Sequence, residues 1–150
     1  MSDQNNFQSQ AGVVRWCVHF HSSADTVYEY LSSADKRRLY WAESAEEQNG
    51  VIKYRFLNGI EDDGRIIEKS PGRLFRVEYF GAEVTFEIEP CEPEGCDMSV
   101  TAKNVEEHER CELIAGWVSW LMAMKGAVDF GIDLRNHDPE RTWADGFADN

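Results

Sequence analysis

His19 and His21 are the residues of this chain whose types and spacing most directly suggest chemistry. Two imidazoles that stand two residues apart on one face of a strand could share a metal ion. The sequence offers no third ligand beside them. We therefore favour a structural role for both histidines and predict no metal site.

Carboxylates and a further histidine are the other candidates for acid and base chemistry. Asp62 and Asp63 could pair as an acid and a base, but a charged pair beside a glycine is more typical of a bulge or turn. His137 precedes Asp138, which could orient its imidazole, and we expect this pair to help fix the C-terminal tail. No serine-nucleophile or phosphate-loop motif is present. The sequence names no catalytic residue and no cofactor, and a non-enzymatic role is favoured.

The four cysteines form no Cys-x-x-Cys motif. Cys91 and Cys96 flank a turn, so a disulfide across that hairpin is conceivable. Free thiols are expected instead, because cytosolic residence is the default for a chain whose N-terminus resembles no secretory signal. A zinc site is disfavoured because no histidine stands at matching spacing near these cysteines.

A set of large apolar side chains, with one arginine, offers a second kind of site. Such residues can line an apolar cavity that contains a few polar groups, although they can equally fill a core. Arg55 alternates with its strand neighbours, so it could anchor an anion only if the cavity lies on its side. The candidate ligand-binding residues are Tyr40, Trp41, Tyr54, Arg55, Phe56, Trp117, Trp120 and Met124.

Composition limits the class of protein. The 150 residues are 42% hydrophobic and 12% aromatic, as in ordinary globular domains. The formal net charge is −13, from 15 basic and 28 acidic residues, so nucleic acids and anionic membranes are disfavoured as partners. No apolar run approaches the ~20 residues that a membrane span needs.

Apolar periodicity predicts the elements that would position these side chains. A strand over 13–20 is followed by a helix that begins near Ala24 and a short second helix from Asp35 to Trp41. Glu43 to Gly50 is expected to be a charged loop. A long helix is predicted from Glu109 to Leu134, with apolar residues at three- and four-residue steps. The remaining strands are predicted over 51–57, 60–69, 74–80, 84–89 and 98–105.

This order of elements defines an α+β fold with one antiparallel sheet. We expect a disordered N-terminal tail over 1–12, a single domain over 13–135 and a C-terminal tail over 136–150. Because that last tail contains Trp143 and Phe147, we expect it to pack back on the domain.

Four local patterns link the chain to a known superfamily. They are Gly64-x-Ile66-x-Glu68-x-x-x-Gly72-x-Leu74, Val84-x-Phe86-x-Ile88-x-Pro90, Gly116-Trp117 followed by Leu121 and Lys125, and Asp138-Pro139-x-Arg141-Thr142-Trp143. In this order they resemble the helix-grip fold of the START and birch-pollen-allergen-like superfamily (SRPBCC). Within it, the chain resembles the family named after the C-terminal domain of the activator of the ninety-kilodalton heat-shock chaperone's ATPase.

The resemblance implies a curved antiparallel sheet of about six strands wrapped on a long C-terminal helix, with two short helices after the first strand. It also implies a hollow between sheet and helix. The superfamily includes lipid carriers, polyketide cyclases and plant hormone receptors, so it does not specify function. The chain departs from many members at Cys96-Asp97, where they place a threonine before the last strand.

Three functions follow as hypotheses. The first is a non-enzymatic module that binds a small apolar or aromatic ligand, which Tyr40, Tyr54 or Arg55 would orient by hydrogen bonds. The second is a cyclase- or hydratase-like enzyme, which needs an inward-facing titratable group. The third is a protein-interaction or stress-related module that acts as a homodimer, through an exposed apolar patch near Trp143 and Phe147.

Overall fold

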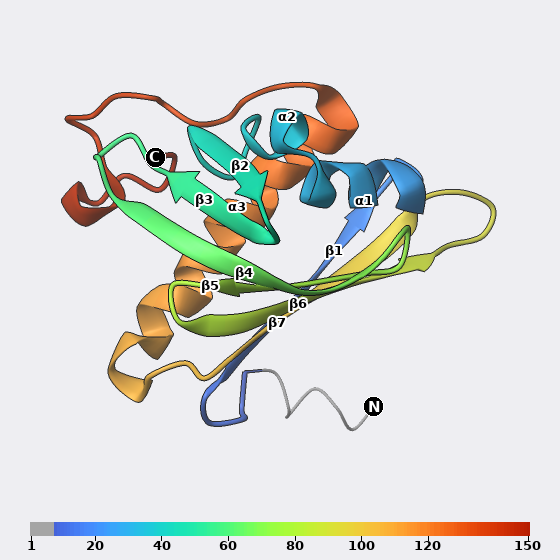
Figure 1. Cartoon of the computed structure of the whole chain (residues 1–150), viewed down its shortest axis with the longest axis horizontal. Helices are drawn as coiled ribbons and strands as arrows, with labels where there is room; N and C mark the ends of the chain where they lie inside the picture. Colours follow the sequence, from blue (N-terminus) through green and yellow to red (C-terminus); the bar gives the residue numbers. More distant parts are fainter. Residues whose placement is uncertain (1–7) are drawn as a thin grey trace.

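The computed structural model describes residues 8–150, and the predicted tail over 1–12 therefore lies partly outside the described residues. Its strands form one antiparallel sheet in the order β1-β7-β6-β5-β4-β3-β2 (Figure 1). The strands are β1 Val13–Phe20, β2 Ser44–Gln48, β3 Val51–Arg55, β4 Glu61–Ser70, β5 Leu74–Tyr79, β6 Ala82–Pro90 and β7 Cys96–Lys103. The helices are α1 Ala24–Ser32, α2 Ala34–Arg37 and α3 Arg110–Phe130, with 3-10 turns η2 Glu107–Glu109 and η3 Trp143–Asp145.

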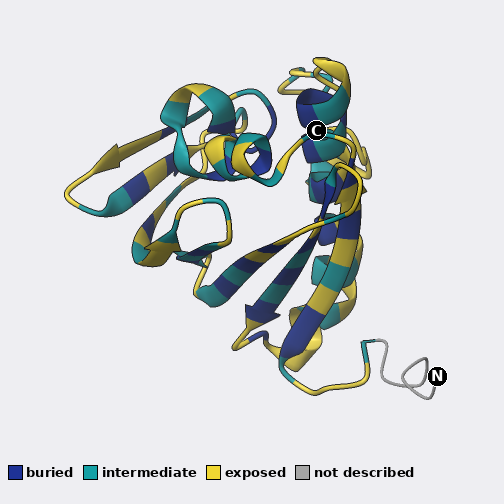
Figure 2. Ribbon diagram, turned by 90° about the vertical axis from the view of Figure 1, so that its right-hand side faces the viewer, coloured by how far each residue is buried: buried dark blue, intermediate teal, exposed yellow. Residues whose placement is uncertain are grey.

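The sheet presents one face to α1 and α3 and the other to solvent. Along β1, Val14, Val18 and Phe20 are buried while His19 is exposed, as the alternation of the strand requires (Figure 2). β7 pairs with β1 in the register Val14↔Ala102 and repeats the alternation. The core therefore lies between this inner face and α3, as the helix-grip prediction required.

The predicted charged loop over 43–50 is wrong, because residues Ser44–Gln48 form β2 and raise the strand number from about six to seven. Asn49 and Gly50 connect β2 to β3 with positive φ at both positions, 54° and 78°. Positive φ at both residues is characteristic of the type I′ turn, which commonly joins two strands in a two-residue hairpin. Only Ala45 of β2 is buried, so the strand has almost no apolar signal.

The long helix ends at Phe130 rather than at Leu134. Gly131 adopts the left-handed conformation, with φ 65°, and donates its N–H to the carbonyl of Ala127. Ile132 N–H donates to the carbonyl of Gly126, so the left-handed residue lets two carbonyls of the last turns find donors. The apolar residues beyond Gly131 thus continue the sequence pattern but belong to an extended segment.

The 24-residue segment Glu107–Phe130 is long and apolar enough to cross a membrane. Its most apolar stretch has a mean hydropathy of 1.2 and is 33% buried. This corrects the expectation that no segment approaches that length. A single helix of this kind is weak evidence for a membrane span, because core helices meet the same criteria. Here α3 packs its buried face, which includes Leu121 and Met124, against the sheet.

A glycine allows the sheet to bend sharply at β4. A Cβ atom on Gly64 would lie 2.0 Å from the carbonyl oxygen of Glu78 on β5 and 3.0 Å from the Tyr54 ring. The β4–β5 register shifts just beyond it, between Ile66 and Glu68. A bulge increases local strand twist, so β2, β3 and the start of β4 curl away from the rest of the sheet. This curl leaves room beside α3.

Candidate functional site

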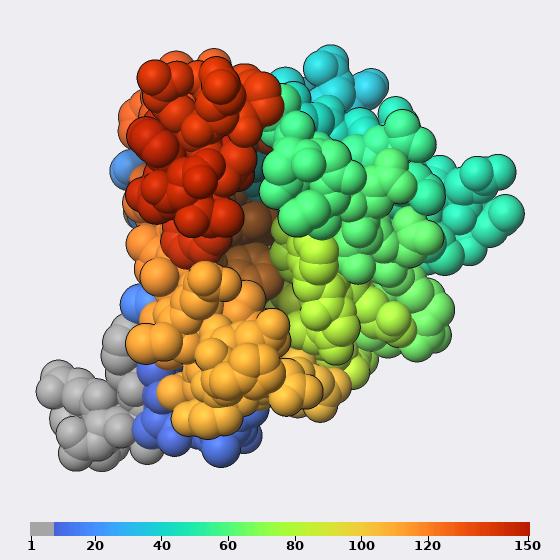
Figure 3. All heavy atoms as spheres, turned by 90° about the vertical axis from the view of Figure 1, so that its left-hand side faces the viewer, coloured from blue at the N-terminus to red at the C-terminus, as the bar shows by residue number. Residues whose placement is uncertain are grey.

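An open cleft of about 860 Å³ lies between α3, the β3–β4 and β5–β6 turns and the C-terminal segment. In Figure 3 it is the hollow between that segment (red), α3 (orange) and the strands from β3 to β5 (green). Its wall is mainly apolar and includes Tyr40, Trp41, Tyr79, Trp117 and Trp120. The volume falls within the range of small-molecule sites.

The inner wall is a continuous network of aromatic rings. The centroid of Trp41 lies 4.9 Å from that of Trp120 and 5.0 Å from that of Tyr54. Trp120 also stacks on Phe86 at 5.3 Å and meets Trp117 at 5.0 Å. Because each ring contacts several others, the rings form one continuous apolar surface.

Three buried hydrogen-bond donors at or behind this wall have no hydrogen-bond partner among residues 8–150. They are the indole N–H groups of Trp41 and Trp120 and the hydroxyl of Tyr54, which lies behind the wall. The rings of Trp41 and Tyr79 lie 5.6 Å apart, centroid to centroid. Burial raises the pKa of the phenols of Tyr54 and Tyr79 far above the usual value, so both stay neutral donors. Unpaired buried donors are costly, and a bound acceptor would remove that cost.

The predicted ligand-binding residues divide into three groups. Tyr40, Trp41, Phe56, Trp117 and Trp120 line the cleft. Tyr54 and Met124 are fully buried behind its wall. Arg55 lies on the solvent face, as its alternation with Tyr54 predicts, and forms an ion pair of 3.2 Å with Glu61. It therefore cannot anchor a ligand in this cleft.

The arginine that does reach the interior is Arg37, which the sequence analysis missed. It is fully buried, and its guanidinium donates to the carbonyls of Ala45, at 2.7 and 3.1 Å, and of Leu31, at 3.0 Å. Burial lowers its pKa, which nearby Tyr54 and Tyr40 partly oppose. The side chain joins α1 to β2 behind the cleft. The sequence offered no signal for this burial beyond an arginine in a short, mainly polar helix.

The C-terminal segment forms one rim of the cleft through Trp143 and residues 148–150. Its attachment begins at Arg135, whose side chain is 8% exposed and donates to the carbonyls of Ala42, at 3.0 Å, and Arg38, at 2.9 Å. His137 bridges two carboxylates, with Nδ1 2.8 Å from Glu43 and Nε2 2.7 Å from Asp133. Only a protonated imidazole donates from both nitrogens.

The hydrogen bond to Asp133 raises the pKa of His137, and the nearby Glu43 acts in the same direction. His137 thus pairs with Asp133 and Glu43 rather than with Asp138, the neighbour that the sequence suggested. Asp138 instead binds Arg141 and the N–H of Glu140.

None of the three predicted acid or base candidates, Asp62, Asp63 and His19, lines the cleft. Asp62 accepts a hydrogen bond of 2.8 Å from Phe80 N–H, and Asp63 forms an ion pair of 3.5 Å with Lys53. His19 lies on the outer face of the sheet, where its side chain is 51% exposed. The described residues therefore offer no general acid or base of this set to a ligand in the cleft.

All four cysteines are free thiols, as the sequence predicted. Cys96 is buried, and burial raises its thiol pKa to about 11, whereas Cys91 stands at the surface beside Asp97 and His19. His19, Cys91 and Asp97 belong to different strands and turns of the sheet. Their side chains bring together metal-binding groups that sequence spacing did not connect.

A curved antiparallel sheet closed on a long C-terminal helix, with two short helices after the first strand, is the helix-grip fold. Similar solved structures include the protein SSP2350 of Staphylococcus saprophyticus, at 21% identity and TM-score 0.72, which covers 82% of this chain and 96% of that one. The Aha1 dimer of Colwellia psychrerythraea is similar at 20% identity and TM-score 0.71, over 79% of this chain and 97% of that one.

A third similar structure is DynU16, encoded in the dynemicin biosynthetic locus, at 17% identity and TM-score 0.70. It covers 83% of this chain and 49% of that one. No family model and no curated protein matches the sequence. At these identities the likeness concerns the fold, so function has to be argued from the cleft.

Proposed function

We propose that this protein binds a small, largely apolar and planar ligand in the cleft between α3 and the curled part of the sheet. The observation that carries the proposal is the cleft of about 860 Å³ whose aromatic wall contains Trp41 and Trp120, each with an unpaired indole N–H. Binding would remove apolar ligand surface from water and stack it on the rings. A rotation of the Trp120 ring would bring its buried indole N–H to a carbonyl or phenolate oxygen on the ligand, which would supply the missing acceptor.

A non-enzymatic role is favoured over a cyclase- or hydratase-like one. Chemistry on such a ligand would need a titratable group enclosed with it, and His19, Asp62 and Asp63 all have other positions or partners. The two side-chain carboxylates among the lining residues, Glu112 and Asp149, are exposed to solvent. Cytoplasmic residence stays a prediction from the sequence.

The proposal is tested first by native mass spectrometry of the protein purified from its own host. We expect a reproducible extra mass on the protein, which would identify the ligand. Intrinsic fluorescence then measures affinity for that ligand or for a planar aromatic carboxylate, because four of the five tryptophans line the cleft.

Two variants make this binding test specific. Ala123→Phe would fill the cleft from α3, and Trp120→Phe would remove the indole donor while keeping an aromatic ring. We expect each variant to weaken binding by about tenfold or more. Cys111→Leu, an exposed change on the same helix outside the cleft, is the control. Equal affinities for all four proteins would refute the cleft as the site.

A homodimer is the second candidate, because exposed apolar residues surround the mouth of the cleft. Ile60 and Phe80 on the sheet side are 50% and 52% exposed, and Val118 and Met122 on α3 are 40% and 46% exposed. Exposed apolar patches commonly mark interfaces, and the similar Aha1 structure is of a dimer. Sedimentation of the wild type and of Met122→Lys tests it, with a monomeric wild type as the contrary outcome.

A further inference from the structure

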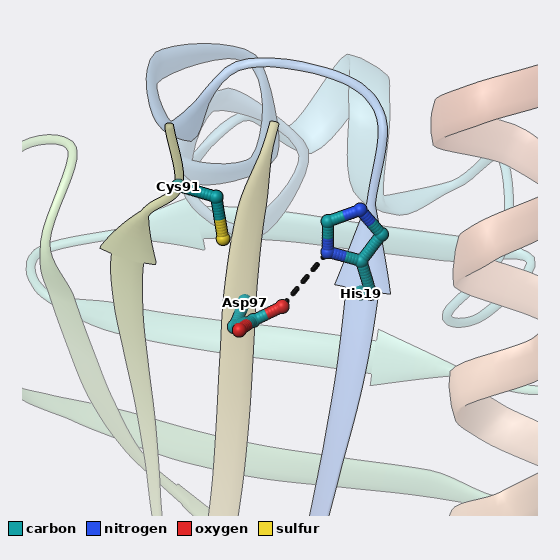
Figure 4. Close-up of side chains that lie close together, drawn as sticks. All are labelled: His19, Cys91 and Asp97. Carbon is teal, nitrogen blue, oxygen red and sulfur yellow. Dashed lines mark hydrogen bonds and ion pairs between the residues drawn. The ribbon is translucent and has the colours of Figure 1, made fainter. Parts of the chain in front are cut away.

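Three side chains of kinds that bind transition metals meet at one corner of the sheet (Figure 4). They are the imidazole of His19 near the end of β1, the thiol of Cys91 just after β6 and the carboxylate of Asp97 near the start of β7. Their ligand atoms all lie within 4.8 Å of one another. His19 Nδ1 is 2.8 Å from Asp97 Oδ1.

The strand register and one tight turn bring these groups together. His19 is directly opposite Asp97 in the β1–β7 pair, so their side chains leave the same face of the sheet. The β6–β7 turn closes with a hydrogen bond of 3.0 Å from Cys91 N–H to the carbonyl of Gly95. A Cβ atom on Gly95 would lie 2.6 Å from the carbonyl of Phe20 and 3.4 Å from the His19 ring. The turn therefore packs directly against the end of β1.

We propose that His19, Cys91 and Asp97 form a binding site for a divalent transition-metal ion of the zinc class. Imidazole nitrogen, thiolate sulfur and carboxylate oxygen are the three ligand types that zinc accepts in proteins. This site is separate from the cleft and does not depend on the function proposed for it.

The geometry requires only small side-chain rotations. Metal–ligand bonds of about 2.0 to 2.3 Å in a tetrahedral site separate the ligand atoms by about 3.3 to 3.6 Å. The atoms already lie within 4.8 Å, and the side chains of His19 and Asp97 are 51% and 61% exposed, which leaves a path for the ion. Three protein ligands leave a further coordination position open to water.

Binding would rearrange two protons. In the metal-free protein His19 Nδ1–H donates to the Asp97 carboxylate, so a metal at Nδ1 requires the ring proton at Nε2 instead. Cys91 binds as the thiolate, and its proton passes to solvent. One proton is thus released for each ion bound. The ion would tie the β6–β7 turn to the end of β1.

Cobalt(II) titration of the full chain tests the proposal, because a cobalt–thiolate bond gives a charge-transfer absorption. We expect the band to saturate at one equivalent and to disappear when zinc is added. Cys91→Ser should abolish the band, and His19→Gln and Asp97→Asn should each weaken binding by about tenfold or more. Cys111→Ser removes another exposed thiol and should bind as the wild type does.

A second readout does not depend on absorption. Zinc should raise the melting temperature of the wild type and of Cys111→Ser but not that of Cys91→Ser. Circular dichroism shows whether each variant is folded before titration. A band that persists in Cys91→Ser, or one that is lost in Cys111→Ser, would overturn the assignment. Absence of any band in the folded wild type would reduce the cluster to a hydrogen-bonded surface group.

Discussion

Asp129 is a buried carboxylate that connects α3 to the turn between β1 and α1. Its side chain is 1% exposed and accepts hydrogen bonds from the N–H groups of His21, at 2.9 Å, and Ser22, at 3.1 Å. The hydroxyl of Ser22 and the ammonium of Lys125 donate as well, at 2.8 and 2.9 Å. Burial opposes ionisation of Asp129, but these donors outweigh it and lower the pKa to about 2.

Asp129→Asn should lower the free energy of unfolding at neutral pH by about 3 kcal/mol, because charged acceptors make the stronger hydrogen bonds. The folded-state pKa lies below that of the unfolded chain. The stabilisation is therefore complete above about pH 4 and is lost as pH falls through about 2. Urea denaturation across this range measures it. Glu107→Gln, an exposed change in η2, is the control, and an equal loss there would contradict the argument.

For some residues the sequence pattern is enough to predict the environment of the side chain. For others that environment is known only from the three-dimensional fold. The aromatic character of the cleft wall followed from Trp117 and Trp120 on one helix. The choice between Arg55 and Arg37 did not, because Arg37 becomes buried only when β2 covers it. The grouping of His19 with Asp97 and Cys91 could not be predicted either, since it depends on the β1–β7 register and on the β6–β7 turn.

At the scale of elements, the close approach of β4 and β5 depends on Gly64. Any side chain there would meet the backbone of Glu78 at 2.0 Å, and backbone cannot rotate away. Gly64→Ala should therefore lower the free energy of unfolding by about 2 to 3 kcal/mol. It should also disturb Tyr54, whose ring is the next contact at 3.0 Å.

Gly116→Ala in α3 is the matched comparison, because its added Cβ would have only Trp143 nearby, at 3.9 Å. Alanine is the better helix former, so this change should raise the free energy of unfolding by about 0.5 to 1 kcal/mol. Thermal and urea denaturation of both variants measure the contrast. Similar values for the two would show that β4 and β5 separate without cost.

Most elements were predicted because their apolar residues alternate or recur at helical spacing. β2 was not, because four of its five residues are polar and an edge strand needs only one buried side chain. Its signal was the turn that follows: Asn49-Gly50 is the hairpin dipeptide, and both residues have positive φ. At the other end of the domain, Gly131 ended α3 despite apolar residues beyond it.

At the scale of the whole molecule, the C-terminal segment couples pH to the cleft through His137. The pKa of His137 is raised by its bond to Asp133, so the double bridge contributes below the unfolded value near 6.5 and is lost as pH rises through the higher folded value. Above it, a neutral imidazole can donate to only one of Glu43 and Asp133. Alkaline pH should therefore loosen residues 138–150 and widen the cleft.

Hydrogen exchange of this segment, between about pH 6 and about pH 9, measures the effect after correction for the intrinsic rate. We expect protection to fall with pH in the wild type. His137→Gln should have low protection throughout, since an amide cannot bridge both carboxylates. His108→Gln, at an exposed position in η2, should behave as the wild type does. Protection that does not change with pH would exclude this coupling.

β2 ends the sheet on one side, and the outer edge of such a strand has backbone groups that could pair with a strand of another molecule. Glu46 and Glu47 are exposed or nearly so on this edge, in a chain of net charge −13. Two such edges repel each other at neutral pH, so the polar sequence that concealed the strand also protects it from edge-to-edge aggregation.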